Sequence, residues 1–79
     1  MAARRIPPIQ IVNNIRRLRF ERGEMTQQEL AERIGVTRQT VIAIEASRYS
    51  PTLELAFRIA AAFAVPLDEV FQLQPHEHR

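Results

Sequence analysis

Hydrophobic residues recur at every third or fourth position along most of this 79-residue chain, the spacing that places them on one face of a helix. This spacing predicts helices over residues 10–22, 26–34, 37–45, 52–63 and 67–71. Phe20, near the end of the first helix, is expected in the core or at its edge. The pattern therefore predicts an all-α fold.

Residues 26–45 carry the strongest local signals for two short helices joined by a tight turn. Thr26 and Glu29 have the spacing of a capping box, in which each side chain accepts a hydrogen bond from a backbone N–H at the helix start. Gly35 suits the left-handed conformation that ends a helix, and Thr37 is placed to cap the second helix. Because only about three residues separate the helices, we expect them to cross sharply, as in a DNA-binding helix-turn-helix.

The first turn of the second helix is rich in hydrogen-bonding side chains: Thr37, Arg38, Gln39 and Thr40. In a helix-turn-helix, these positions face base edges in the major groove. Arginine pairs bidentately with guanine, glutamine pairs with adenine, and a threonine methyl contacts thymine. A merely solvated helix start is the alternative interpretation, but the cap, the turn and the spacing together favour DNA binding.

The composition limits the chain to one small domain, because a chain of this size buries only roughly 60% of the surface that its unfolded form exposes. Hydrophobic residues make up 46% of the sequence, and cysteine is absent. Neither a disulfide nor a thiolate-bound metal can therefore compensate for the thin core. A helical bundle meets these limits, and dimerisation would add to its stability.

All 11 basic residues are arginines, against 9 acidic residues, for a formal net charge of +2. Several crowd the N-terminal part of the chain: Arg4, Arg5, Arg16, Arg17, Arg19 and Arg22. The planar guanidinium can bind two phosphate oxygens, so this cluster fits a nucleic-acid partner. Genome composition explains an arginine-only chain equally well, so the charge alone does not decide.

Three segments are expected: a flexible N-terminal arm over residues 1–9, a folded domain over residues 10–73 and a tail over residues 74–79. A proline pair disfavours helix in the arm, whose Arg4 and Arg5 either reach DNA or are disordered. The chain has no apolar run of about 18 residues and no signal peptide. A cytoplasmic protein is therefore expected.

No residues in the sequence suggest catalysis. His76 and His78 are the only histidines, and both lie in the polar tail, where we expect solvation rather than a metal site. Gly23 and Gly35 are the only glycines, so the chain has no glycine-rich phosphate loop. The sequence predicts no enzyme activity, no metal and no cofactor.

A series of short motifs follows one another along the chain: Leu18-Arg19-x-x-Arg22-Gly23, Thr26-Gln27-x-Glu29-Leu30-Ala31, Gly35-Val36-Thr37-Arg38-Gln39-Thr40-Val41, Ile44-Glu45, Pro51-Thr52-Leu53-Glu54-Leu55-Ala56 and Leu67-Asp68-Glu69-Val70-Phe71. In this order they resemble the Cro/CI-type (XRE-type) helix-turn-helix regulators. The resemblance covers about residues 10–73. It implies a compact five-helix domain that binds operator DNA, normally as a homodimer on a pseudo-palindrome.

The resemblance also implies roles for individual residues. The base-reading positions fall on Thr37, Arg38, Gln39 and Ala43. Phosphate contacts are expected at the start of the second helix and in the loop after the third: Thr26, Gln27, Arg48, Tyr49 and Ser50. An ion pair between Arg19 and Glu45 would tie the first helix to the third.

A dimer interface is expected among apolar residues that a small domain cannot easily cover: Phe57, Leu67, Val70 and Phe71. The sequence thus indicates a transcriptional regulator, most simply a repressor, whose partners are double-stranded DNA and a second copy of the chain. An antitoxin or restriction-modification controller, with a further protein partner, is one alternative. A protein-interaction module without DNA binding is another, although the arginines of the first helix argue against it.

Overall fold

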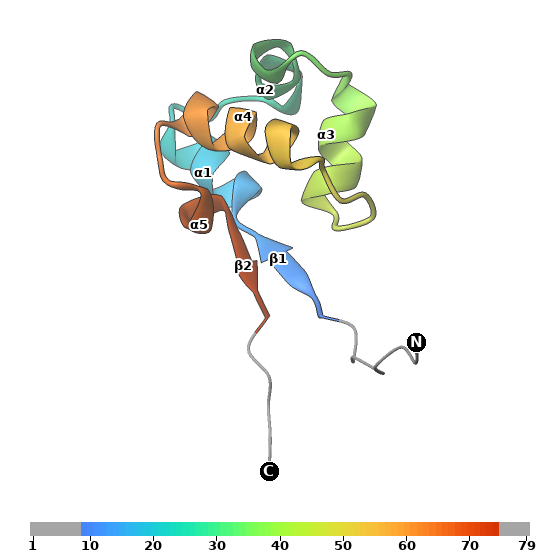
Figure 1. Cartoon of the computed structure of the whole chain (residues 1–79). Coiled ribbons are helices and arrows are strands. Elements are labelled where there is room, and N and C mark those ends of the chain that lie inside the picture. Colours follow the sequence, from blue (N-terminus) through green and yellow to red (C-terminus); the bar gives the residue numbers. More distant parts are fainter. Residues whose placement is uncertain (1–8, 75–79) are drawn as a thin grey trace, which may run out of the picture.

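Residues 9–74 are described by the computed structural model, which has five helices and one two-stranded sheet in this range (Figure 1). In chain order the elements are β1 (Ile11–Asn13), α1 (Ile15–Glu21), α2 (Gln27–Ile34), α3 (Arg38–Glu45), α4 (Leu53–Phe63), α5 (Leu67–Val70) and β2 (Phe71–Leu73). The five-helix expectation is confirmed. Most of the predicted arm and tail lies outside the described residues, including Arg4, Arg5, His76 and His78.

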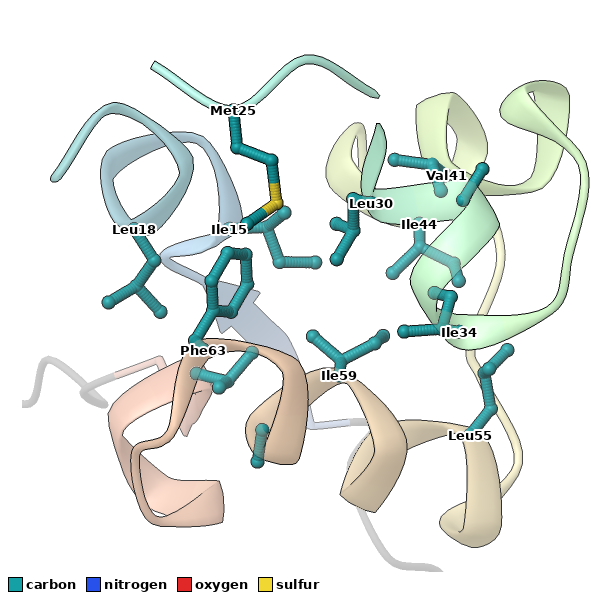
Figure 2. Packing of buried hydrophobic residues seen from close by; sticks show 13 residues of the cluster. Ile15, Leu18, Met25, Leu30, Ile34, Val41, Ile44, Leu55, Ile59 and Phe63 are labelled. Atoms are coloured by element: carbon teal, nitrogen blue, oxygen red, sulfur yellow. The ribbon is translucent and has the colours of Figure 1, made fainter. Parts of the chain in front are cut away.

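The core lies where α1, α2, α3 and α4 meet. Figure 2 shows side chains from these helices converging, with Phe63 of α4 pointing into the cluster. The largest fully buried side chains are Phe63, Ile15, Leu18, Leu30, Ile34, Ile44, Ile59, Val41 and Val70. Burying one side chain of this size contributes roughly 1.5–3 kcal/mol, so helices this short depend on their shared core for stability.

The turn between α2 and α3 has the predicted geometry. The Glu29 N–H donates to Thr26 Oγ1 at 3.0 Å, and the Thr26 N–H donates to Glu29 Oε1 at 2.8 Å, which completes the capping box. Gly35 ends α2 with φ of 78°, in the left-handed region. Thr37 then caps α3, and the chain enters that helix directly.

The prediction of a helix over residues 10–22 is wrong in its first part, because Ile11–Asn13 form a strand and α1 begins at Ile15. At this point the Asn13 Oδ1 accepts a hydrogen bond from the Ile15 N–H at 3.1 Å, which satisfies an N–H group at the start of α1. The Asn14 N–H donates to the carbonyl of Val70 at 2.9 Å instead of to a residue of a preceding turn.

The last predicted helix, over residues 67–71, ends one residue earlier than expected, at Val70. Phe71 does not close the last helix but opens β2, which pairs antiparallel with β1 and sets Leu73 opposite Ile11. In Figure 1 the two strands extend from the helical body on the side away from α2. Across residues 9–74, no helix combines the length and the apolar character needed to cross a membrane.

Two side chains lie where the sequence did not predict them. Phe20 is 53% exposed, so the expectation of a core or core-edge position is wrong. Val70 is 0% exposed and belongs to the core cluster. Because Val70 is covered within one copy of the chain, it cannot belong to the dimer interface that was expected to include it.

Candidate nucleic-acid interface

The start of α3 presents polar side chains on a capped and exposed helix end. The hydroxyl of Thr37 accepts from the Thr40 N–H at 3.2 Å and lies 3.0 Å from the Thr40 hydroxyl. Arg38 and Gln39 come next and are both exposed. Within residues 9–74 neither side chain makes a hydrogen bond or an ion pair, so their donors are available to a partner. Ala43, further along α3, is half-buried.

An open groove of 690 Å³, here called the polar groove, runs beside the start of α3. Its lining comes from β1, α1, α2 and α3: Asn13, Arg16, Arg19, Phe20, Thr26, Gln27, Gln28, Arg38, Ile42, Glu45 and Ala46. The structure thus brings the expected phosphate positions Thr26 and Gln27 together with the expected base-reading residue Arg38. Thr37, Gln39 and Ala43 lie outside this lining.

A network centred on Glu45 fixes one wall of the polar groove. Arg19 NH2 donates to Glu45 Oε2 at 2.8 Å, and Gln27 Nε2 donates to Glu45 Oε1 at 2.9 Å. Arg19 NH1 also donates to the carbonyl of Met25 at 2.9 Å. The side chains of the ion pair are only 12% and 11% exposed. The network therefore holds α3 against α1 and against the start of α2.

Two of the expected phosphate contacts already make hydrogen bonds within the protein. One amide N–H of the Gln27 side chain is engaged by Glu45, and the Thr26 hydroxyl oxygen accepts a hydrogen bond in the capping box. The backbone N–H groups of Gln27 and Gln28, at the first turn of α2, have no hydrogen-bond partner within residues 9–74. These two groups are free backbone donors at this helix end, where the helix dipole favours an anion.

The second residue after α3, Ser47, lies in the left-handed region with φ of 61°. The Arg48 N–H donates to the carbonyl of Ala43 at 2.8 Å, which closes the helix end. Arg48, Tyr49 and Ser50 are all exposed. The structure does not place these three expected phosphate contacts in the polar groove.

Tyr49 and Ser50 line a second, mainly apolar groove of 660 Å³. Its other lining residues come from β1 and the two residues before it, α3 and the loop that follows it, α4, α5 and β2: Ile9, Gln10, Ile11, Val12, Asn13, Ile44, Ser47, Pro51, Leu53, Ala56, Leu67 and Phe71. Leu67 and Phe71, both expected at a dimer interface, are half-buried here. Phe57 lies outside the groove.

Large apolar side chains remain exposed around this groove, and five of them are here called the apolar face: Ile9 (69% exposed), Leu53 (68%), Leu73 (61%), Phe57 (53%) and Ile11 (50%). Ile11 and Leu73 are cross-strand partners and so point to the same side of the sheet. Leu53 and Phe57 lie one turn apart on α4 and so share one side of that helix. Strand and helix together give the surface its apolar character.

Some of the conspicuous arginines are engaged within the protein. Arg22 Nε and NH2 donate to the carbonyl of Phe63 at 3.0 and 2.7 Å, which ties the end of α1 to the end of α4. Arg17 pairs with Glu21 at 3.1 Å on the exposed side of α1. The sequence gave no signal for the role of Arg22, because its partner lies 41 positions away. No three histidine, aspartate or glutamate side chains of residues 9–74 gather as a ligand set for a metal.

Comparison with known proteins identifies a family model and several relatives that match this chain. The family model described as Helix-turn-helix matches residues 15–70, which include all of α1 to α5. The chain is 47% identical over 53 residues to the HTH-type transcriptional regulator MJ0272 of Methanocaldococcus jannaschii, covering 67% of this chain and 80% of that protein.

Two further relatives are similar over most of this chain. The HTH-type transcriptional regulator YgzD of Bacillus subtilis is 45% identical over 62 residues, covering 78% of this chain and 92% of that protein. The cryptic phage CTXphi transcriptional repressor RstR of Vibrio cholerae is 40% identical over 58 residues, covering 73% of this chain and 51% of that protein.

Proposed function

The chain belongs to the helix-turn-helix family of DNA-binding transcriptional regulators, and on that premise we propose that it recognises a specific operator in double-stranded DNA. The observation that carries this proposal is the exposed, capped start of α3. There Arg38 and Gln39 are free of partners within residues 9–74 and stand next to the polar groove.

Base reading is assigned first to Arg38 and Gln39. In a helix-turn-helix the N-terminal residues of the second helix meet base edges, and these two side chains suit guanine and adenine respectively. Thr37 and Ala43 are assigned weaker base contacts. The Thr37 hydroxyl is engaged by its cap, and Ala43 offers only a methyl group, so each is proposed to contact a thymine methyl.

Backbone contacts are assigned to both sides of α3. At the start of α2, the free backbone N–H groups of Gln27 and Gln28 would receive a phosphate, and the hydroxyl of Thr26 would lie beside it. After α3, Arg48 supplies a charge that has no ion-pair partner within residues 9–74. Tyr49 and Ser50 would add neutral donors from the same loop.

A homodimer is proposed to form through the apolar face and to bind a pseudo-palindromic operator. Isolated exposed apolar residues are common, but Ile9, Ile11 and Leu53 line one groove, and such patches mark interaction sites. Leu73 joins them as the cross-strand partner of Ile11. Phe57 extends this surface along α4, and Leu67 and Phe71 line the groove itself. This assignment keeps three of the residues that the sequence indicated and replaces Val70.

Repression is the regulatory role proposed, because a small protein that occupies an operator blocks access to it without needing any further activity. The relative named as a phage transcriptional repressor supports this direction. Occupancy by the dimer would then depend on its concentration.

The decisive experiment is an in vitro selection from random duplex DNA at near-physiological salt, with the Arg38→Ala/Gln39→Ala double variant as the matched control. We expect the wild-type chain to enrich an inverted repeat with half-sites about one helical turn apart. The double variant should keep its fold and lose the enrichment. Retention without an enriched sequence would reduce the proposal to nonspecific backbone binding, and no retention at all would favour a protein-interaction module.

A further inference from the structure

Arg16 on α1 differs from its neighbouring arginines in having no hydrogen-bond or ion-pair partner in the described part of the chain. Arg17 is paired with Glu21, Arg19 with Glu45, and Arg22 with the carbonyl of Phe63. Arg16 is exposed and makes no hydrogen bond or ion pair within residues 9–74. One positive charge of α1 is therefore left uncompensated.

The exposed ring of Phe20 gives this charge a defined position. The guanidinium carbon of Arg16 lies 5.8 Å from the ring centroid, and that of Arg19 lies 6.0 Å from it. Both distances fall within the range of a cation–π contact. Phe20 is 53% exposed. Its contact with Arg16 limits the conformations of the Arg16 side chain, which would otherwise be free in solvent.

The position matters because Arg16 and Phe20 both line the polar groove. The same groove holds the start of α2, with the free N–H groups of Gln27 and Gln28, and the unpaired Arg38 at the start of α3. The donors of three different helices thus border one open space. A guanidinium suits a phosphate in such a space because its planar fork can bind two oxygens.

We infer that Arg16, held over Phe20, is a DNA-backbone contact that extends the interface from α2 and α3 onto α1. This inference rests on the proposed function and names a further part of the same binding surface. The occupant is one backbone phosphate of the operator, bound between Arg16 and the N-terminal turn of α2. Arg16 adds affinity at that phosphate and reads no base.

The test compares Arg16→Gln with Arg17→Gln in the full chain, using the operator obtained by selection and fluorescence anisotropy over a range of salt concentrations. Both variants remove one positive charge from α1, but only Arg16 lines the polar groove. We expect Arg16→Gln to weaken binding several-fold and to lower the salt slope by about one, as for the loss of one phosphate contact. Arg17→Gln should leave the slope nearly unchanged, and Phe20→Leu should give an intermediate loss.

A second measurement locates the contact. Operators carrying a single neutral methylphosphonate are bound by wild-type and Arg16→Gln proteins, one backbone position at a time. At one backbone position, the methylphosphonate should weaken binding by the wild-type protein. It should have little further effect on the Arg16→Gln protein, because that variant has already lost the same contact.

The possible failures are distinguishable. Equal losses for Arg16→Gln and Arg17→Gln, or the absence of any non-additive methylphosphonate position, would overturn the inference while leaving operator binding intact. A wild-type chain that binds no duplex DNA would overturn both the inference and the proposed function.

Discussion

Arg19 of α1 and Glu45 of α3 form an ion pair of 2.8 Å between two side chains that are only 12% and 11% exposed. Removing one member leaves the other buried without its counter-charge. We predict that Glu45→Ala lowers the free energy of unfolding by about 3 kcal/mol, as measured by urea denaturation.

The matched control is Glu21→Ala, which breaks the Arg17–Glu21 pair at 49% and 47% side-chain exposure. An exposed pair of this kind contributes less than about 1 kcal/mol. If the two variants had the same midpoint of denaturation, the Arg19–Glu45 pair would have no special structural role.

Arg22 is predicted to stabilise the fold rather than to bind DNA. Its two hydrogen bonds to the carbonyl of Phe63 close the end of α4. Arg22→Ala should lower the free energy of unfolding by about 1.5 kcal/mol, in the range of hydrogen bonds made by charged groups. Arg22→Lys, which cannot supply the same two-pronged contact, should recover only part of the loss. A variant that weakened operator binding without affecting stability would contradict this role.

Two variants separate base reading from backbone binding. Gln39→Ala should cost about 1–3 kcal/mol of binding free energy and relax the preference at one base pair. Arg48→Ala should instead weaken all sequences alike and lower the salt slope by about one. Anisotropy titrations against the selected operator and single-base variants measure both effects. Unchanged affinity and preference in both proteins would refute the contact assignment.

The apolar face is predicted to hold the dimer together. Leu53 is 68% exposed at the first position of α4, where a negative charge is compatible with the helix dipole. Leu53→Glu should therefore yield a folded monomer in sedimentation equilibrium at tens of micromolar, whereas Leu53→Met should remain dimeric. A wild-type chain that is monomeric both with and without operator would exclude the proposed dimer.

At the C-terminal ends of α2 and α4, we predict two substitutions that change the stability of the protein in opposite directions. Gly35 has φ of 78° and Ala64 has φ of 58°, so both lie in the left-handed region. An added Cβ at Gly35 would meet only Arg58 NH1, at 3.7 Å, so Gly35→Ala tests backbone strain and not crowding.

We expect Gly35→Ala to destabilise the protein by about 1 kcal/mol, since a side chain is strained in this region. Ala64→Gly should relieve the same strain and stabilise the protein by about 0.5 kcal/mol, because greater freedom of the unfolded chain offsets part of the gain. Thermal unfolding measures both changes. Shifts of the same sign would show that factors other than left-handed strain dominate.

The local signals in the sequence were sufficient for the central motif. In the caps at Thr26 and Thr37 the interacting groups lie three residues apart, and the turn at Gly35 depends on the conformation of one residue. Such features need no distant partner, so the pattern of residues specifies them directly. The exposed polar start of α3 followed from the same local reasoning.

The sheet could not be derived in this way. Ile11 and Val12 fit the stripe of a helix as well as they fit a strand, and short apolar runs are ambiguous in this respect. The alternation of apolar and polar residues in Phe71-Gln72-Leu73-Gln74 was a real but brief strand signal. Pairing between chain segments far apart in the sequence decided the outcome.

By itself, then, the sequence determined the helices around the turn, their caps and the polar residues offered at the start of α3, because each depends on neighbours within about one helical turn. The tertiary structure alone decided that Arg22 holds Phe63, that Val70 is buried and that Arg16 shares a groove with Arg38. These relationships join residues far apart in the chain. They arise only when the helices pack together, since burial and contact depend on the whole fold.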